Sequence, residues 1–215
     1  MSVGWTDEEI ATLVAKDFPD GCSVNLGIGL PTLVASVIDP DKLVIIHSEN
    51  GLIGMGPDPE HGKLDPDIVN AGKKSVTLIK GAAIVHQADS FSFIRGGRLD
   101  FSVLGALQVA SNGDLANWRV PGAKGVGGVG GAMDLAVGAK CVYIMMRQID
   151  KNGKSKLVKL CDFPLTAHAC VSKIFTELGV IECRDGQFVV IELAPSVSVE
   201  MMRSSIDASC LFELT

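Results

Sequence analysis

The sequence predicts an α/β protein whose open, mostly parallel sheet is flanked by helices. Two observations lead to this prediction. Short apolar segments with the length of strands alternate with segments whose apolar residues recur at helical spacing, which is typical of α/β domains. The chain of 215 residues is 47% hydrophobic but only 5% aromatic, so it can bury a sizeable aliphatic core. Because no composition break or internal repeat divides it, we expect residues 1–215 to form a single domain.

The first expected element is a helix that begins after Thr6. Thr6 and Glu9 have the spacing of a capping box, in which each side chain accepts a hydrogen bond from the backbone of the other residue. Apolar residues then recur at helical spacing, and a turn-forming segment at residues 19–21 ends the helix.

Two strands with a helix between them follow. Residues 23–26 and 43–47 are expected to be short strands, and residues 33–38 the helix that connects them. The second strand stops at Asn50-Gly51, a dipeptide typical of tight turns. Glu49 therefore lies at the carboxyl end of a strand, where open α/β sheets bind their ligands. A carboxylate at this place can act as a base, a metal ligand or a nucleophile.

The rest of the chain is less regular. Further strands are expected at residues 76–79, 101–104 and 141–146, a helix at 166–178, and a β-hairpin at 180–192 that bends at Asp185-Gly186. Residues 57–70 and 114–131 lack periodicity and are expected to be irregular, and residues 82–94 have too weak a pattern for an assignment.

Composition and charge exclude several classes of function. The net charge of −6 and a pI near 5.2, without a Lys/Arg cluster, argue against a nucleic-acid partner. No apolar stretch approaches the roughly 18 residues of a membrane span, and residues 1–9 do not resemble a signal peptide. The six cysteines are scattered, as in a protein with reduced thiols, so we expect a cytoplasmic protein. A mean hydropathy of +0.33 suggests an apolar face covered by a partner subunit.

Glycine-rich segments follow residue 26, follow Glu49 and occupy residues 125–131. Gly27 and Gly29 lack the third glycine of a dinucleotide fingerprint, and the literal G-x-G-x-x-G at residues 125–130 does not follow a strand. Such segments commonly form tight turns, but their backbone N–H groups can also bind anions and oxyanions. A nucleotide-dependent oxidoreductase or regulator remains an alternative, and a catalytically silent structural subunit is another.

Other polar residues have structural interpretations beside functional ones. The pleat of the strand places His47 on the same side as Glu49, although a hydrogen-bonded strand-end histidine is the interpretation we favour. Asp114, Asn117 and Trp118 are best explained as a turn that anchors the tryptophan, and Asp134 as an acid in the first turn of a helix. No pair of histidines has metal-ligand spacing, so we expect no metal site.

Several segments together resemble the family I CoA-transferases, and more narrowly the β subunit of the 3-oxoacid CoA-transferases. They occur in unbroken order between about residue 8 and residue 182: residues 25–31, 48–51, 69–73, 94–97, 113–118, 130–135 and 164–166. Residues 47–57 and 86–91 resemble the 3-oxoadipate branch more than the acetoacetate branch. The resemblance implies a CoA-transferase β-subunit type of α/β fold.

The resemblance also implies roles for individual residues. Glu49 would be the nucleophile of a ping-pong reaction that passes through a glutamyl-CoA thioester, with coenzyme A as a substrate and no permanently bound cofactor. The Gly131 backbone would donate to the oxyanion, with Gly130 as the alternative donor, and Asn25 would lie close to the reacting thioester. We expect the substrate-binding residues to be Gly27, Gly29 and Asn50.

A separate α subunit is a further implication of the resemblance, because this chain contains no counterpart of the family's α half. The expected assembly is a heterodimer or an α2β2 complex. The expected donor is succinyl-CoA, and the acceptor is 3-oxoadipate or acetoacetate, as in the catabolism of aromatic compounds or ketone bodies. An acetate or short-chain acyl CoA-transferase of the same family is the alternative.

Overall fold

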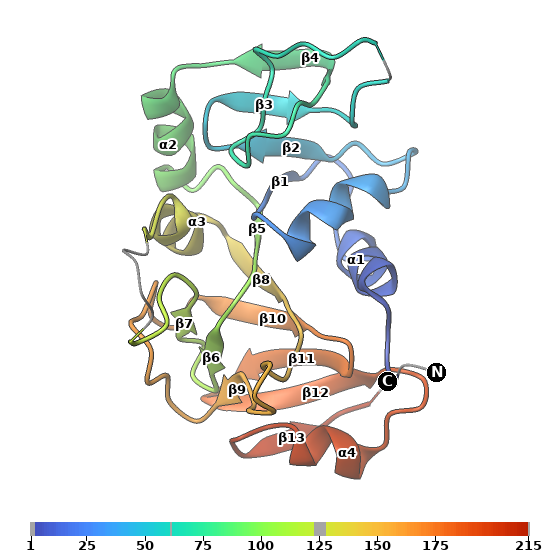
Figure 1. Cartoon of the computed structure of the whole chain (residues 1–215), viewed down its shortest axis with the longest axis vertical. Helices are drawn as coiled ribbons and strands as arrows, with labels where there is room; N and C mark the ends of the chain where they lie inside the picture. The colour runs from blue at the N-terminus through green and yellow to red at the C-terminus, as the bar shows by residue number, and fades with distance from the viewer. Residues whose placement is uncertain (1–2, 61, 123–127, 215) are drawn as a thin grey trace.

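A computed structural model describes residues 3–60, 62–122 and 128–214, and its main feature is a ten-stranded sheet with the order β13-β12-β11-β10-β8-β5-β1-β2-β3-β4 (Figure 1). The strands of this sheet are β1 (Ser23–Leu26), β2 (Ile45–Ser48), β3 (Leu52–Met55), β4 (Leu78–Ile84), β5 (Phe101–Leu104), β8 (Cys141–Met145), β10 (Val171–Phe175), β11 (Gly179–Arg184), β12 (Gln187–Leu193) and β13 (Cys210–Phe212). A small sheet contains β7 (Leu115–Ala116), β6 (Gln108–Ala110) and β9 (Leu157–Val158). The helices are α1 (Asp7–Lys16), the 3-10 helix η1 (Leu30–Ser36), α2 (Gln87–Arg95), α3 (Ala132–Gly138) and α4 (Val199–Ser204).

The middle of the large sheet is parallel, from β10 through β8, β5 and β1 to β2. Antiparallel pairs extend it on both sides, through β3 and β4 on one side and the hairpin of β11 and β12 on the other, beyond which β13 pairs with β12 in parallel. The α/β class and the open sheet with a parallel core are therefore confirmed, and the complete sheet is mixed.

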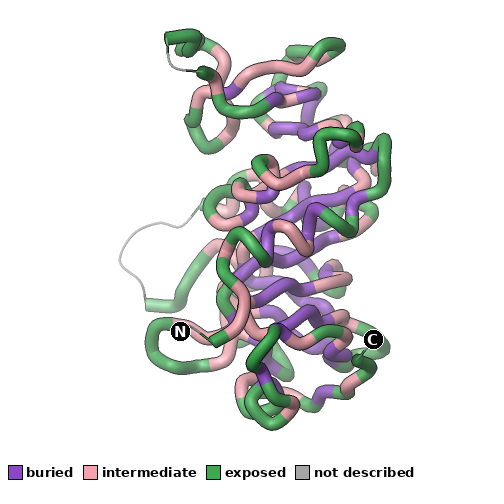
Figure 2. Tube along the Cα trace, turned by 90° about the vertical axis from the view of Figure 1, so that its right-hand side faces the viewer, coloured by how far each residue is buried: buried purple, intermediate pink, exposed green. Residues whose placement is uncertain are grey.

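Both faces of the sheet are covered. In β8, Val142 and Ile144 belong to the apolar core that includes residues of α2, α3 and α4, whereas Tyr143 and Met145 belong to the core beneath α1 and η1. Because successive strand residues point to opposite faces, this alternation assigns the two cores to opposite sides of the sheet. Figure 2 shows the resulting buried centre along the length of the molecule.

The expected capping box is present at the start of α1. The Thr6 N–H donates to Glu9 Oε2 over 2.7 Å, and the Glu9 N–H donates to Thr6 Oγ1 over 3.2 Å. The helix expected at residues 33–38 is instead η1, which begins earlier. Pro31 stands in its first turn and the Thr32 hydroxyl bonds back to the Gly29 carbonyl, so the chain turns tightly as soon as it leaves β1.

The helix expected at residues 166–178 is wrong, because residues 171–175 form β10. This strand lies inside the sheet, between β8 and β11. An interior strand buries apolar side chains on both faces, so its apolar residues do not alternate and can imitate a helical face. The hairpin expected at 180–192 is confirmed, and its turn at Asp185-Gly186 has the two positive φ angles (50° and 76°) of a tight hairpin turn.

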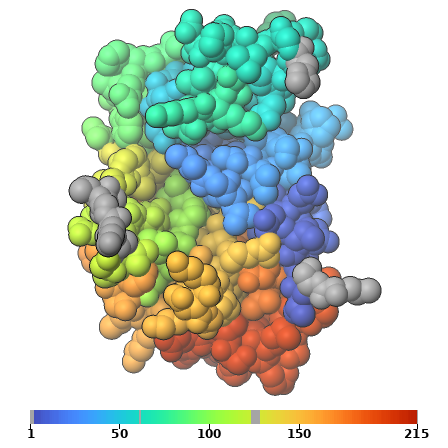
Figure 3. Space-filling model, in the orientation of Figure 1, coloured from blue at the N-terminus to red at the C-terminus, as the bar shows by residue number. Residues whose placement is uncertain are grey.

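The segment that resisted assignment, residues 82–94, contains the end of β4 and most of α2. The strand expected at 76–79 begins two residues later, at Leu78. In Figure 3, β3, β4 and the intervening segment form the upper end of the molecule, and the C-terminal elements form the lower end. Within the described ranges, no helix has the length and apolarity needed to cross a membrane.

Candidate active site

Glu49 lies in the tight turn between β2 and β3. The Gly51 N–H donates to the Ser48 carbonyl over 3.0 Å, and the Val85 N–H donates to the Gly51 carbonyl over 2.9 Å. Gly51 has a φ of 123°, and a Cβ at this position would lie 2.2 Å from the Val85 carbonyl oxygen. Only glycine is compatible with this conformation and this contact, so the turn that presents Glu49 depends on it.

The Asn25 side chain holds one oxygen of the Glu49 carboxylate. Asn25 on β1 is paired in register with His47 on β2, so the two side chains lie next to each other on one face of the sheet. The Asn25 Nδ2 donates to Glu49 Oε2 over 3.0 Å and lies 3.2 Å from the His47 carbonyl oxygen. In the described part of the chain, no hydrogen bond to the other Glu49 oxygen is found. One carboxylate oxygen is thus held by Asn25, and the other has no hydrogen-bond partner among the described residues.

His47 is buried directly beside this contact. Its Nδ1 lies 3.3 Å from Asn25 Nδ2, its Nε2 lies 2.8 Å from Ser90 Oγ, and its ring stacks on Phe93 with centroids 5.5 Å apart. Burial lowers the pKa of His47 below its ordinary value of 6.5, against the opposing effect of the Glu49 charge. His47 is therefore neutral at physiological pH. The sequence placed it correctly on the side of Glu49.

Gly131 lies next to Glu49, at the start of α3. A Cβ on Gly131 would be 3.6 Å from Glu49 Cγ and 3.2 Å from the Phe91 ring. Gly131 is the residue before the first turn of α3, where backbone N–H groups lack helical acceptors. Gly130 has a φ of 55° and open space around its Cβ position. A Cβ on Gly131 would thus lie within 4 Å of the Glu49 side chain, and one on Gly130 would not. Residues 123–127, which contain part of the G-x-G-x-x-G segment, lie outside the described ranges.

The three expected substrate-binding residues have different environments. Gly27 packs against β5, where a Cβ would be 3.0 Å from the Val103 carbonyl oxygen, so close packing already requires glycine there. Gly29 has a φ of 92° and open space around it. Asn50 is exposed, and its Nδ2 donates to the Val69 carbonyl over 2.7 Å. Asn50 thereby ties the 69–75 segment to the turn that carries Glu49.

The other polar candidates have structural roles. Asp114 accepts hydrogen bonds from the Ala169 N–H and from Asn112, and these bonds, aided by His168, lower its pKa although desolvation opposes them. The Trp118 Nε1 donates to the Leu165 carbonyl over 3.2 Å, as expected for an anchored turn.

Asp134 has a partner outside its own helix. It lies in the first turn of α3 and pairs with Arg95 on α2 over 2.6 Å, which joins the two helices beside Glu49.

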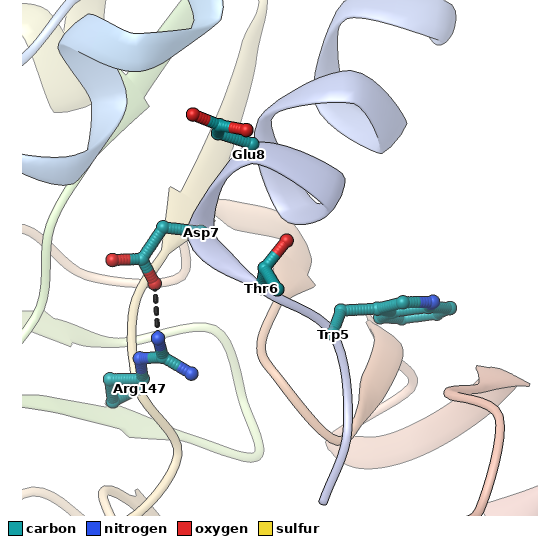
Figure 4. Close-up of a pocket in the computed structure, with 5 residues that line it drawn as sticks. All are labelled: Trp5, Thr6, Asp7, Glu8 and Arg147. Atoms are coloured by element: carbon teal, nitrogen blue, oxygen red, sulfur yellow. Dashed lines mark hydrogen bonds and ion pairs between the residues drawn. The ribbon is translucent and has the colours of Figure 1, made fainter. Parts of the chain in front are cut away.

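A hollow away from Glu49 lies at the N-terminal end of α1, lined by Trp5, Thr6, Asp7, Glu8 and Arg147. Figure 4 shows that Asp7 and Arg147 pair with each other there, so the guanidinium of the hollow already has a carboxylate partner. Among the described residues, no group of His, Cys, Asp and Glu side chains could hold a metal ion.

Sequence reasoning missed the contribution of α2. Ser90 contacts His47, Phe91 lies against Gly131, and Phe93 stacks on His47. The local signal was the four-residue spacing of Ser90 and Ile94, whose burial is visible only in the structure, together with His86 at the N-cap position. This signal is weak because most of the other residues in α2 are exposed or half-buried.

Comparisons with known proteins agree with one another. Residues 7–203 match the family described as Coenzyme A transferase. The chain is 51% identical over 195 residues to the B subunit of 3-oxoadipate CoA-transferase from Pseudomonas putida, which covers 91% of each protein. It is 44% identical over 201 residues to the B subunit of succinyl-CoA:3-ketoacid coenzyme A transferase from Helicobacter pylori, covering 94% of this chain and 96% of that protein.

A solved structure shares the fold. The acyl-CoA transferase YdiF of Escherichia coli O157:H7, solved as a thioester complex with CoA, has a TM-score of 0.75 at 18% sequence identity. The match covers 100% of this chain and 43% of that chain.

Proposed function

Because the chain belongs to the Coenzyme A transferase family and is a CoA-transferase subunit, we propose that its Glu49 is the nucleophile that carries CoA between two acids. Because the family is that of the CoA-transferases, the glycine-rich segments are no longer interpreted as parts of a nucleotide-dependent oxidoreductase.

The proposed reaction has two symmetrical halves. The Glu49 carboxylate attacks the thioester carbonyl of the donor, which forms a mixed anhydride and releases the CoA thiolate. The thiolate then attacks the glutamyl carbonyl, which forms a glutamyl-CoA thioester and releases the donor acid. The carboxylate of the acceptor attacks this thioester, and the released thiolate takes the acyl group from the second anhydride, which restores Glu49. Covalent catalysis of this kind divides a difficult transfer into easier steps.

The observation that carries this proposal is the hydrogen bond from Asn25 to Glu49 Oε2. It orients the carboxylate without occupying its second oxygen. Each attack creates an oxyanion, and a fixed N–H donor at such a site contributes about 3 to 4 kcal/mol to transition-state stabilisation. The Gly131 backbone is the donor we propose, since Gly131 lies beside Glu49 at the N-terminal end of α3. YdiF, which shares the fold, is known in a thioester complex with CoA.

We propose succinyl-CoA as the donor and 3-oxoadipate as the first acceptor to examine. The relative named for 3-oxoadipate is 51% identical, and the relative named for succinyl-CoA and a 3-ketoacid is 44% identical. CoA would enter and leave as a substrate. Acetoacetate is the second acceptor, which differs from 3-oxoadipate in having no distal carboxylate.

The proposed assembly contains a separate α subunit. Both relatives are named as B subunits, which implies a second kind of subunit in each of those enzymes. Large apolar side chains are strongly exposed on this chain, including Ile28 (74%), which follows β1, and Val137 (76%) on α3. Covering them with a partner would remove apolar surface from water.

Substitution of the nucleophile tests the proposal. Glu49→Gln preserves the shape of the side chain but removes the nucleophilic carboxylate, so we expect turnover to fall at least about a thousandfold. Glu8→Gln, at an exposed position of α1, is the matched control and should retain full activity. Turnover by purified Glu49→Gln complex at a rate close to wild type would refute the nucleophile assignment.

A further inference from the structure

We propose that His47, anchored by Ser90, is a positioning residue that sets which way the Asn25 amide faces and so keeps an N–H on Glu49. The inference rests on the proposed nucleophilic role of Glu49. His47 does not touch the carboxylate in this arrangement and acts through Asn25.

The Asn25 amide has two possible orientations, and only one of them is useful. With Nδ2 toward Glu49 and the His47 carbonyl, both contacts are donor to acceptor. With the amide reversed, Oδ1 would face a carboxylate oxygen and a carbonyl oxygen, and both contacts would be repulsive. The amide orientation therefore decides whether Glu49 is held.

The opposite end of the Asn25 side chain does not fix this orientation. Asn25 Oδ1 is buried and finds no hydrogen-bond donor among the described residues, and the same holds for Ser102 Oγ. Ser102 is the register partner of Asn25 on β5, so two unpaired polar atoms lie on adjacent strands. The amide is therefore held from its nitrogen side, where three acceptors face Nδ2: Glu49 Oε2, the His47 carbonyl and the His47 imidazole. The imidazole is the one of the three that a substitution can remove without touching Glu49 or the backbone.

His47 can perform this task only in one neutral form. The Asn25 amide has two N–H groups for these three acceptors, so the N–H that faces the His47 carbonyl is shared with His47 Nδ1. To accept this shared N–H, Nδ1 must carry no proton, so the proton lies on Nε2. Nε2 then donates to Ser90 Oγ over 2.8 Å, and the Ser90 hydroxyl donates onward to the Ser48 carbonyl over 3.5 Å, a long contact. A chain of hydrogen bonds thus runs from the Ser48 carbonyl through Ser90, His47 and Asn25 to Glu49, and each contact pairs a donor with an acceptor.

Burial keeps this chain of contacts intact. The exposed fractions are 1% for His47 and 0% for Ser90. Water cannot readily replace either partner, and the stacked Phe93 ring opposes rotation of the imidazole. Glu49 is the charged group that acts on His47, and its field favours protonation, whereas burial opposes it and prevails. Burial thus keeps His47 in the neutral form that can accept a hydrogen bond from Asn25.

Two substitutions separate the positioning role from a packing role. His47→Asn places an amide oxygen near the position of Nδ1 and so can still accept from Asn25, whereas His47→Gln reaches the position of Nε2 and leaves Asn25 without that acceptor. Each variant is purified in complex with its partner subunit, and kcat and KM for succinyl-CoA are measured together with the rate at which CoA becomes attached to Glu49.

We expect His47→Asn, which keeps the acceptor but also lacks the Ser90 contact, to lose about three- to tenfold in kcat, and His47→Gln to lose more, about ten- to a hundredfold, with KM changed by no more than about twofold. Equal losses in the two variants, or wild-type kcat in His47→Gln, would overturn the positioning role. An absence of CoA on Glu49 in the wild-type complex would instead overturn the proposed function.

A milder pair covers the case in which the His47 variants fail to assemble. Ser90→Ala removes the anchor of Nε2, and kcat should fall about three- to tenfold. Ser92→Ala, on the same helix, removes an exposed hydroxyl whose one hydrogen bond within the described residues goes to the Ala88 carbonyl, and kcat should not change. Full kcat in Ser90→Ala would contradict the inference.

Discussion

At the scale of single residues, the sequence identifies Glu49 as the candidate residue of the site, but it does not reveal the contacts that Glu49 makes. Glu49 could be placed from the sequence because the Asn50-Gly51 turn marks the end of its strand. The hydrogen bond from Asn25 could not be derived, because it depends on the register between β1 and β2, two strands separated by η1. Register is set by the packing of the whole sheet.

The lowered pKa of His47 makes a prediction about stability. As the pH falls below 6.5, histidine in the unfolded chain takes up a proton while buried His47 does not. The unfolded state then binds more protons, so the stability that His47 contributes above this pH is lost as the pH falls toward its folded pKa. Denaturant unfolding between about pH 7.5 and about pH 5.5 should show a smaller decline for His47→Gln than for wild type. Identical slopes would exclude this coupling.

At the scale of elements, local signals succeeded where a segment has its own boundary markers. The capping box of α1 and the Asp-Gly turn of the last hairpin were both recognisable. Residues 171–175 were misassigned because their apolar residues suit a helical face as well as an interior strand, and only their place beside β8 decides between the two. α2 was not assigned because just two of its residues, Ser90 and Ile94, are buried.

The β2–β3 turn is the element on which the site depends most directly. Gly51→Ala would put a Cβ against the Val85 carbonyl and force an unfavourable φ, so we expect a loss of at least about 1 to 3 kcal/mol in the free energy of unfolding and a large fall in kcat. Gly105→Ala, where a Cβ would meet no atom within 4 Å, is the control. Thermal unfolding and turnover are measured for both variants. A Gly51→Ala protein that is as stable and as active as Gly105→Ala would disprove the requirement for glycine at position 51.

At the scale of the whole molecule, the parallel centre of the sheet brings β1, β2 and the N-terminal end of α3 together around Glu49. The exposed apolar side chains are those that we propose a partner subunit covers. We expect the chain alone to have little or no transferase activity, and activity to appear when the α subunit is added. Light scattering and succinyl-CoA consumption, followed across a titration of the α subunit, would show this. Full turnover by the isolated chain would contradict the proposed assembly.

The central claim is that Glu49 carries CoA, and peptide mass analysis of the complex after incubation with succinyl-CoA tests it most directly. We predict a CoA adduct, joined by a thioester, on the peptide that contains Glu49, and its removal by 3-oxoadipate or acetoacetate. The Glu49→Gln complex, treated in the same way, should show no adduct. An adduct on another residue, or none in an assembled wild-type complex that turns over, would contradict the claim.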